Sequence, residues 1–334
     1  MSVGTQQNAP PPLTAGAAAP LPTVREQGPW YRSRPDSSWI VKAFFILLLV
    51  GLAILFLYPF EWLAAAAFKP RGETFDNAFL PQTWSWNFSG EAIPSPAPQK
   101  LFNVAPVARW MWNSIWISCL GAALTTFASA LVAFAFAYFR FPLRNFFFGV
   151  LLATLMLPGE VTMIPVYLLW NHIGKFTLAH PILPHIGTNT QYPLWVPNAF
   201  GSAFYIFLQR QFFMGIPRDY FEAARMDGDG YWSMFRRIAL PLAKPALIVT
   251  FIFEIQAKWF DLITPLIYLR DQALFTAPLG MKILLDRFNA GGGGEGDYQV
   301  IMAGTFLLIL PMIILFAAFQ KYFIRGIAVQ GKKG

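Results

Sequence analysis

The sequence has little charge, one cysteine and three histidines. Of its 334 residues only 13% are charged, whereas 56% are hydrophobic and 17% are aromatic. These proportions depart from soluble averages toward those of a membrane protein. The one cysteine, Cys119, excludes an intrachain disulfide. His172, His180 and His185 fall in one loop without a nearby cysteine or carboxylate, so we expect a solvated loop and no metal site.

The chain also lacks a Walker-type phosphate-binding loop. Its glycine cluster, Gly291, Gly292, Gly293 and Gly294, is not followed by Gly-Lys-Ser or Gly-Lys-Thr. We therefore expect no ATP or other cofactor to be bound by this chain. The net charge of +8 could suggest nucleic acid, but Lys and Arg cluster in loops between apolar runs, which argues against that partner.

Long apolar runs divide the chain into a tail and a membrane domain. Residues 1–38 are rich in Ala, Pro, Gly and Gln, which predicts a disordered cytoplasmic tail. Residues 39–334 are predicted to form one all-α transmembrane domain in the lipid bilayer. Six runs approach or exceed the roughly 20 residues that cross a bilayer: 39–60, 112–139, 146–169, 194–208 extending toward 213, 246–268 and 300–322. The first run starts too late and is too long to belong to a signal peptide.

The distribution of Lys and Arg predicts the orientation of these six spans. With the N-terminus inside, sixteen basic residues fall in cytoplasmic segments and eight in outer loops. Because cytoplasmic loops carry the excess of Lys and Arg, both termini are predicted to be cytoplasmic. This orientation places residues 215–243 in the cytoplasm and residues 289–296 outside.

Residues 215–243 form the longest polar interruption between two apolar runs. Apolar side chains recur in it at helical spacing, which predicts two short amphipathic helices that bury Tyr220, Ala223, Ala224, Tyr231, Phe235 and Ile238. Gly228 is placed where a helix would end in a left-handed turn. The second helix is predicted to end before Pro241.

A family pattern lies in the same segment. It consists of Glu222, Ala223 and Ala224, then Asp227 and Gly228, and nine residues later Ile238, Leu240 and Pro241. The spacing resembles the coupling loop of membrane permeases in ATP-binding-cassette importers. Asp229 is a departure, because the family usually has a small residue there. The alternative is an ordinary amphipathic linker between membrane helices.

Segments along residues 40–334 are similar to the sugar-type branch of these permeases, typified by the smaller maltose permease subunit. They include residues 58–62, 140–142, 207–213, 259–261 and 320–326. The resemblance implies a six-span, type I ABC importer permease fold in the cell inner membrane. It also implies three kinds of partner: a second homologous permease subunit in a heterodimer, two cytoplasmic ATPase subunits that use ATP and Mg, and an extracytoplasmic sugar-binding protein. In that family the loop docks in an ATPase cleft, with Glu222 near a basic group.

Two further groups of residues are candidates for function. Asn289 and the four glycines Gly291, Gly292, Gly293 and Gly294 form a flexible outer tip, which is either a plain linker or a probe of the binding protein. Glu254, Lys258 and Asp261 are spaced to share one helical stripe. An unpaired lysine inside a membrane is costly, so we expect a structural ion-pair cluster or a polar lining of the translocation path.

Two other functions compete with the importer hypothesis. A proton-coupled secondary transporter would use the intramembrane groups Glu160, Glu254, Lys258 and Asp261. A membrane-embedded enzyme would use the histidine loop or the same carboxylates. A coupling loop has no role in a secondary transporter, so the sequence favours a transport subunit without its own catalytic site.

Overall fold

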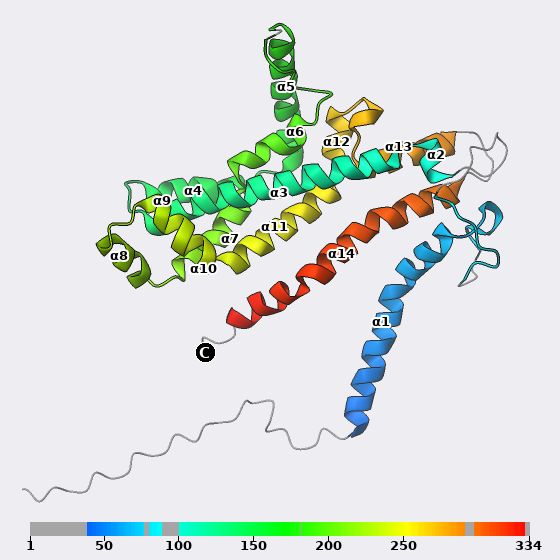
Figure 1. Ribbon diagram of the computed structural model, residues 1–334, viewed down its shortest axis with the longest axis horizontal. Helices are drawn as coiled ribbons and strands as arrows, with labels where there is room; N and C mark the ends of the chain where they lie inside the picture. Colours follow the sequence, from blue (N-terminus) through cyan, green and yellow to red (C-terminus); the bar gives the residue numbers. More distant parts are fainter. Residues whose placement is uncertain (1–38, 77–79, 89–99, 181, 291–296, 331–334) are drawn as a thin grey trace, which may run out of the picture. The chain divides into compact units, whose positions relative to one another are not determined.

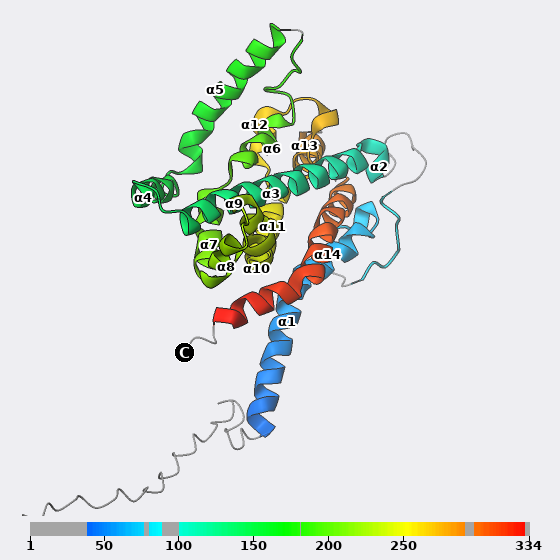
Figure 2. The same ribbon diagram turned by 60° about the vertical axis from the view of Figure 1, so that its left-hand side comes forward.

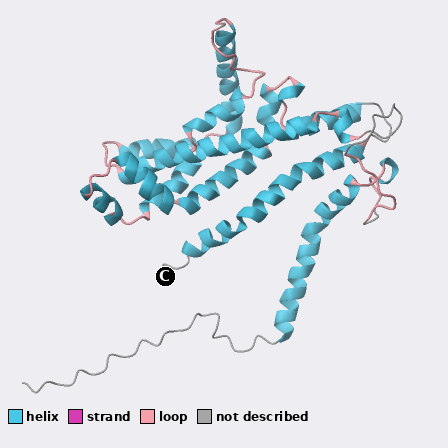
Figure 3. Ribbon diagram, viewed as in Figure 1, coloured by secondary structure: helices cyan, strands magenta, loops and turns pink. Residues whose placement is uncertain are grey.

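The computed structural model describes residues 39–76, 80–88, 100–180, 182–290 and 297–330. Throughout this part of the chain the regular structure is helical and no strand is present (Figure 3). The all-α prediction is therefore confirmed. The N-terminal tail, residues 1–38, and the glycine tip, residues 291–296, lie outside the described residues.

The first predicted span is a single helix. Helix α1 runs over Trp39–Ala67 and is seven residues longer than the apolar run that predicted it (Figure 1). The chain divides within this helix into two units, Met1–Tyr58 and Pro59–Gly334. The second unit contains every site described below.

Helix α3, Val107–Tyr138, is the central element of the second unit. It packs along α7, Ala203–Met214, and along α11, Lys244–Trp259 (Figure 2). The face of α3 that is buried carries mostly small residues: Ser114, Ser118, Gly121, Ala122, Thr125, Ser129, Ala130 and Ala133. Small side chains let helix backbones approach closely where no water drives association.

Polar side chains connect the same helices inside the bundle. The Gln209 amide on α7 donates to the Thr250 hydroxyl on α11 at 3.1 Å. The Trp259 indole on α11 donates to the Leu308 carbonyl on α14, Tyr298–Gln330, at 3.1 Å. Such interhelical hydrogen bonds contribute on the order of 0.6 kcal/mol each in membrane bundles. Together they set which faces of the helices meet.

Two apolar clusters lie at opposite ends of α3. One surrounds Trp110 and includes Phe275, Leu279 and Val300. The other surrounds Phe134 and includes Phe213, Phe221, Met234 and Phe235. Because the second cluster contains residues from the 215–243 segment, that segment is anchored to one end of α3.

Three of the predicted spans are not single straight helices. The third run is broken into α4, Arg144–Thr154, and α5, Gly159–Leu178, which are bent by 96° at Pro158. The fourth run is divided into α6, Tyr192–Trp195, η2, Val196–Phe200, and α7. The fifth ends at Trp259 and resumes as α12, Ile263–Tyr268. Proline lacks an N–H, and Gly201 with φ of 77° cannot continue a helix.

Within the described residues, three helices are long and apolar enough to cross a membrane, and two bent pairs raise the number to five. They are α1, α3 and α14, with the pair α4–α5 and the pair Tyr231–Leu242 with α11. Helix α7 has 12 residues and is about 18 Å long, which is shorter than a bilayer core. Six spans thus stay a prediction.

The remaining elements connect these helices or lie at their ends. They are η1, Arg71–Glu73; α2, Leu101–Val104; α8, Asp219–Met226; α9, Tyr231–Met234; the π-helical η3, Phe235–Ala239; α10, Leu240–Leu242; η4, Gln272–Leu274; and α13, Ala277–Ala290.

Candidate functional site

Helix α8, Asp219–Met226, forms the first half of the candidate coupling segment. Asp219 and Glu222 lie in its first turn, where carboxylates favour the positive end of the helix dipole. Phe221 and Ala224 are buried against the end of α3. The side chains of Glu222 and Ala223 are exposed, and Met226 is 89% exposed. One face of α8 is thus fixed to the membrane helices and the other is free.

The buried face of α8 differs from the predicted one. Ala224 is buried as expected, but Tyr220 is 56% exposed and Ala223 is also exposed, with Phe221 buried in their place. The prediction was wrong because Tyr220 and Phe221 are both aromatic and an eight-residue helix gives little periodicity to separate them. In the second half, Phe235 is buried, Ile238 is half-buried and Tyr231 is exposed.

Gly228 ends α8 in the left-handed turn that the sequence predicts, with φ of 84°. The N–H of Asp229 donates to the carbonyl of Ala224 at 2.9 Å, and the N–H of Gly228 to that of Arg225 at 3.1 Å. This pair of bonds is a Schellman motif, which satisfies the last carbonyls of a helix. A Cβ at position 228 would meet no atom within 4 Å, so glycine is required by the backbone conformation and not by space.

Asp229, the departure from the family pattern, connects the turn to the next helix. Its Oδ1 accepts from the Ser233 hydroxyl at 2.9 Å and lies 3.9 Å from Nη1 of Arg237. Because Arg237 is largely exposed, the ion pair contributes little to stability. The turn at Gly228 is thus left-handed with Asp229 present.

The second half of the segment does not end before Pro241. Helix α9 continues through the π-helical turn Phe235–Ala239 into α10, Leu240–Leu242, which contains Pro241 in its first turn. The N–H of Leu240 donates to the carbonyl of Phe235, five residues earlier. The wider turn accommodates the proline, which has no N–H to donate. The chain then bends by 77° into α11.

Glu254 occupies a buried polar site between three elements. Its Oε1 accepts from the Asn198 amide on η2 at 2.5 Å and from the Thr125 hydroxyl on α3 at 3.4 Å. The Asn198 amide also donates to the Thr125 hydroxyl at 2.6 Å. The Tyr205 side chain on α7 lies close to this carboxylate. The carboxylate connects α3, η2 and α11 through these hydrogen bonds.

The predicted ion-pair cluster of Glu254, Lys258 and Asp261 is not formed. Lys258 Nζ donates to the Leu194 carbonyl at 3.1 Å. Asp261 lies beyond the end of α11 and accepts from the Thr264 N–H at 3.0 Å in the first turn of α12. In the part of the chain that the structure describes, no ion pair joins the three groups. Asp261 does not share the predicted stripe because α11 stops at Trp259, whereas Glu254 and Lys258 share the helix but bind other partners.

The candidate binding-protein loop is described only at its borders. Asn289 lies in the last turn of α13 and accepts a hydrogen bond from the Tyr298 hydroxyl, at the start of α14, at 2.7 Å. The four glycines between these helices lie outside the described residues. Helix α13 is closely packed, since a Cβ at Gly280 would overlap the Trp110 ring. The described border of the loop thus lies on a closely packed helix.

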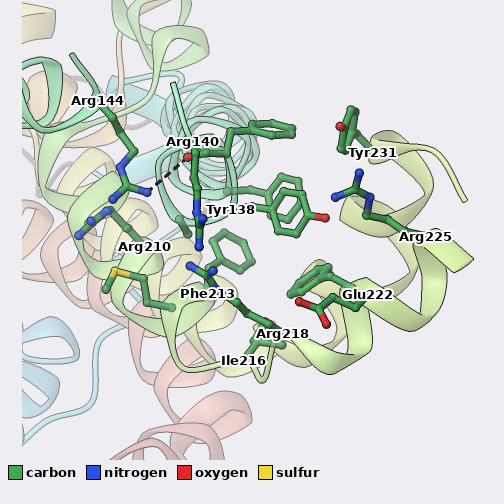
Figure 4. Close-up of a pocket in the computed structure, with 15 residues that line it drawn as sticks. Tyr138, Arg140, Arg144, Arg210, Phe213, Ile216, Arg218, Glu222, Arg225 and Tyr231 are labelled. Carbon is green, nitrogen blue, oxygen red and sulfur yellow. Dashed lines mark hydrogen bonds between the residues drawn. The ribbon is translucent and has the colours of Figure 1, made fainter. Parts of the chain in front are cut away.

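Two cavities border these elements, and the sequence predicted neither. A cavity of about 540 Å³ lies between α8 and the ends of α3, α4 and α7, and five arginines line it (Figure 4). A cavity of about 320 Å³ is lined by Trp116, Tyr192 and Trp195 with the polar side chains of Asn189 and Gln191. Each cavity is formed by several segments that lie far apart in the sequence, so periodicity carries no signal for it.

Comparison with known proteins shows which protein family this chain resembles. A family model described as "Binding-protein-dependent transport system inner membrane component" matches residues 125–329. The arabinooligosaccharides transport system permease protein AraQ of Halalkalibacterium halodurans is 32% identical over 311 residues, which cover 91% of this chain and 99% of that protein. The sn-glycerol-3-phosphate transport system permease protein UgpE of Salmonella typhi is 33% identical over 225 residues, which cover 67% and 74%.

The fold is also similar to that of a solved structure. A chain of a bacterial ABC transporter involved in the import of the acidic polysaccharide alginate superimposes with a TM-score of 0.67 at 20% identity. The match covers 87% of this chain and 100% of that chain. The type I permease fold is thereby confirmed for the chain.

Proposed function

Because the chain belongs to the family of binding-protein-dependent transport system inner membrane components, we propose that it carries a sugar or oligosaccharide into the cytoplasm. Members of this family are transport components and not enzymes. Membership disfavours both rival hypotheses, the proton-coupled secondary transporter and the membrane-embedded enzyme. The sugar substrate is supported by the names of similar proteins, among them permeases for arabinooligosaccharides.

The observation that carries the proposed mechanism is the division of α8 into a buried and a free face. Phe221 and Ala224 hold the helix against the end of α3, whereas Glu222, Ala223 and Met226 are exposed. A short helix with this arrangement can transmit a displacement from a docked partner to the helix bundle. We infer that Glu222, Ala223, Ala224, Asp227, Gly228, Ile238, Leu240 and Pro241 form the segment that couples the chain to an ATPase.

The partners follow from this role. Two cytoplasmic ATPase subunits would bind ATP and Mg, and their closure would move the coupling segment. A second homologous permease subunit would complete the translocation path, and an extracytoplasmic binding protein would deliver the sugar. Asn289 with Gly291, Gly292, Gly293 and Gly294 is the candidate contact for that binding protein, and both termini would lie in the cytoplasm.

Glu254, Lys258 and Asp261 are proposed for different roles within the bundle. The hydrogen bonds of Glu254 to Asn198 and Thr125 support a structural role at the junction of α3, η2 and α11. Lys258 and Asp261 are half-buried, and each has one hydrogen bond to the backbone. Lys258 can therefore donate further hydrogen bonds to a sugar hydroxyl, and Asp261 can accept them. These two groups are the better candidates for the translocation path.

Uptake by proteoliposomes tests the proposed function. The chain would be purified with candidate permease, ATPase and binding-protein partners and reconstituted, and uptake of radiolabelled oligosaccharide would be followed with and without ATP. We expect uptake that requires ATP and the binding protein, and no ATP turnover by this chain alone. Uptake driven by a proton gradient without ATP would contradict the proposal.

A further inference from the structure

The cavity beneath α8 carries a strong excess of positive charge. Its lining includes Arg140, Arg144, Arg210, Arg218 and Arg225, and a single carboxylate, Glu222. Five guanidinium groups and one carboxylate leave four positive charges (five minus one) around about 540 Å³ of open space. Figure 4 shows these side chains arranged around the pocket between α8 and the membrane helices.

Ion pairs within the described residues do not neutralise these arginines. None of the three ion pairs found among the described residues involves an arginine of this pocket. Arg144 donates one hydrogen bond, to the Phe139 carbonyl at 3.3 Å, and has five N–H donors in all. Arg144 also acts electrostatically on Arg210 as a like charge. Like charges that line one pocket repel each other unless an anion lies between them.

Arg210 has an oriented guanidinium group and a buried donor without a partner among the described residues. Its guanidinium carbon lies 4.1 Å from the centre of the Phe148 ring on α4, which orients the planar group. Its Nε is buried and has no hydrogen-bond partner within the described residues. A buried charged donor without an acceptor is costly, so the site is complete only when a ligand supplies one.

The ligand class follows from the geometry of guanidinium groups. A phosphate presents several oxygens and accepts paired hydrogen bonds from arginine, so several arginines can share it. We propose that this pocket binds the phosphate of an anionic phospholipid headgroup. The proposal does not depend on which substrate the protein transports.

The position of the pocket points to a lipid as the source of the phosphate. The pocket lies where α3 and α7 end and α4 begins, and the ends of apolar helices lie at the membrane surface. Next to Arg140 and Arg144 in the chain, Leu143, Phe146 and Phe147 are 67%, 61% and 50% exposed. Apolar side chains beside a basic pocket suit a molecule with acyl chains and a phosphate. Basic pockets between membrane helices bind anionic headgroups in this way.

Native mass spectrometry of the full chain, purified with its partner subunits, tests the proposal. Phosphatidylglycerol and phosphatidylcholine with identical acyl chains would be added in equal amounts. We expect preferential retention of phosphatidylglycerol, and at least about a tenfold loss of that retention in Arg140→Gln/Arg144→Gln. The control Arg236→Gln/Lys244→Gln removes the same charge at two exposed positions outside the pocket and should retain the lipid.

Further variants and outcomes of this experiment distinguish the source of the phosphate. If the double variant does not fold, Arg140→Gln replaces it, because Arg140 is exposed and donates to no protein acceptor in the described part of the chain. Equal retention of both lipids, or unchanged retention in the pocket variants, would overturn the proposal. Saturable binding of inorganic phosphate to delipidated protein without lipid preference would assign the site to free phosphate instead. Cross-linking of Arg140→Cys to an ATPase subunit, with loss of lipid retention on assembly, would assign it to that partner.

Discussion

The ring of Phe221 on α8 lies 5.0 Å, centre to centre, from the ring of Tyr138 in the last turn of α3. Phe134, one turn earlier on α3, lies 6.0 Å from the same ring. Aromatic pairs at these distances contribute about 0.5–1.5 kcal/mol beyond their buried area. The contact connects α8 to α3, the central helix of the bundle, and it is the physical basis of the proposed transmission.

Replacement of Phe221 should release α8 from the bundle. Phe221 is 4% exposed, and truncation of a buried phenylalanine to alanine costs about 3–5 kcal/mol. We expect Phe221→Ala to increase the rate of tryptic cleavage after Arg218 and Arg225, followed by mass spectrometry of the purified complex. The neighbouring Tyr220→Ala is the control, because Tyr220 is 56% exposed and its loss should leave cleavage unchanged. Equal cleavage rates in the two variants would refute the buried face described for α8.

The turn at Gly228 offers a second matched pair. Gly228 has φ of 84°, whereas Gly230 has φ of −77° and ψ of 163°, and neither has an atom within 4 Å of a new Cβ. Gly228→Ala should cost about 1–2 kcal/mol through backbone strain and lower transport, while Gly230→Ala should be tolerated. Thermal unfolding and uptake of both variants would be compared. Similar effects of the two substitutions would show that the left-handed turn does not matter.

The polar site at Glu254 predicts an order of stabilities. Glu254→Ala removes one of the two buried acceptors of the Asn198 amide, leaves it only the Thr125 hydroxyl, and should destabilise by about 1–3 kcal/mol. Glu254→Gln retains an oxygen acceptor and should assemble. Lys258→Met removes only the donor to the Leu194 carbonyl, so it should lower the stability less than Glu254→Ala does. Fluorescence-detected thermal unfolding of the solubilised complex gives the order, and a Lys258→Met effect as large as that of Glu254→Ala would mean that the two charges depend on each other.

The proposed orientation can be measured with single cysteines on a Cys119→Ala background. A cysteine at position 227 should react with a membrane-impermeant maleimide only after membrane disruption, and one at position 292 should react in intact cells. The sixteen-to-eight distribution of basic residues is the reason for this expectation. Reaction at 292 only after disruption would reverse the orientation and remove the coupling segment from the ATPase side.

Features set by local chemistry were predicted well from the sequence. Gly228 was assigned to a left-handed turn because glycine after a short amphipathic helix favours that conformation. The apolar runs that became α1, α3 and α14 were recognised from length and composition. The pattern from Glu222 to Pro241 predicts a coupling segment because both spacings agree with the family pattern, and that role stays a prediction.

Features that depend on tertiary context were not predictable in the same way. The π-turn before Pro241 and the end of α11 at Trp259 interrupt patterns that look continuous in hydropathy. The partner of Glu254 is Asn198 and not Lys258, because chain packing and not sequence spacing decides which polar groups meet. The arginine pocket joins positions from 140 to 225, and no local pattern connects them.

The most direct measurement of the central claim is the coupling of ATP hydrolysis to uptake in proteoliposomes that contain Glu222→Lys. Glu222 is solvent-exposed at the rim of the arginine pocket and is not part of the buried face of α8, so its reversal should repel a basic docking site on a partner without unfolding the chain. Asp286→Lys is the matched control, because it reverses an exposed carboxylate on α13, away from the coupling segment. The account predicts that Glu222→Lys assembles normally and that its ATP-dependent sugar uptake falls at least about tenfold, while Asp286→Lys transports normally. Full uptake by Glu222→Lys at normal expression would contradict the coupling role of α8.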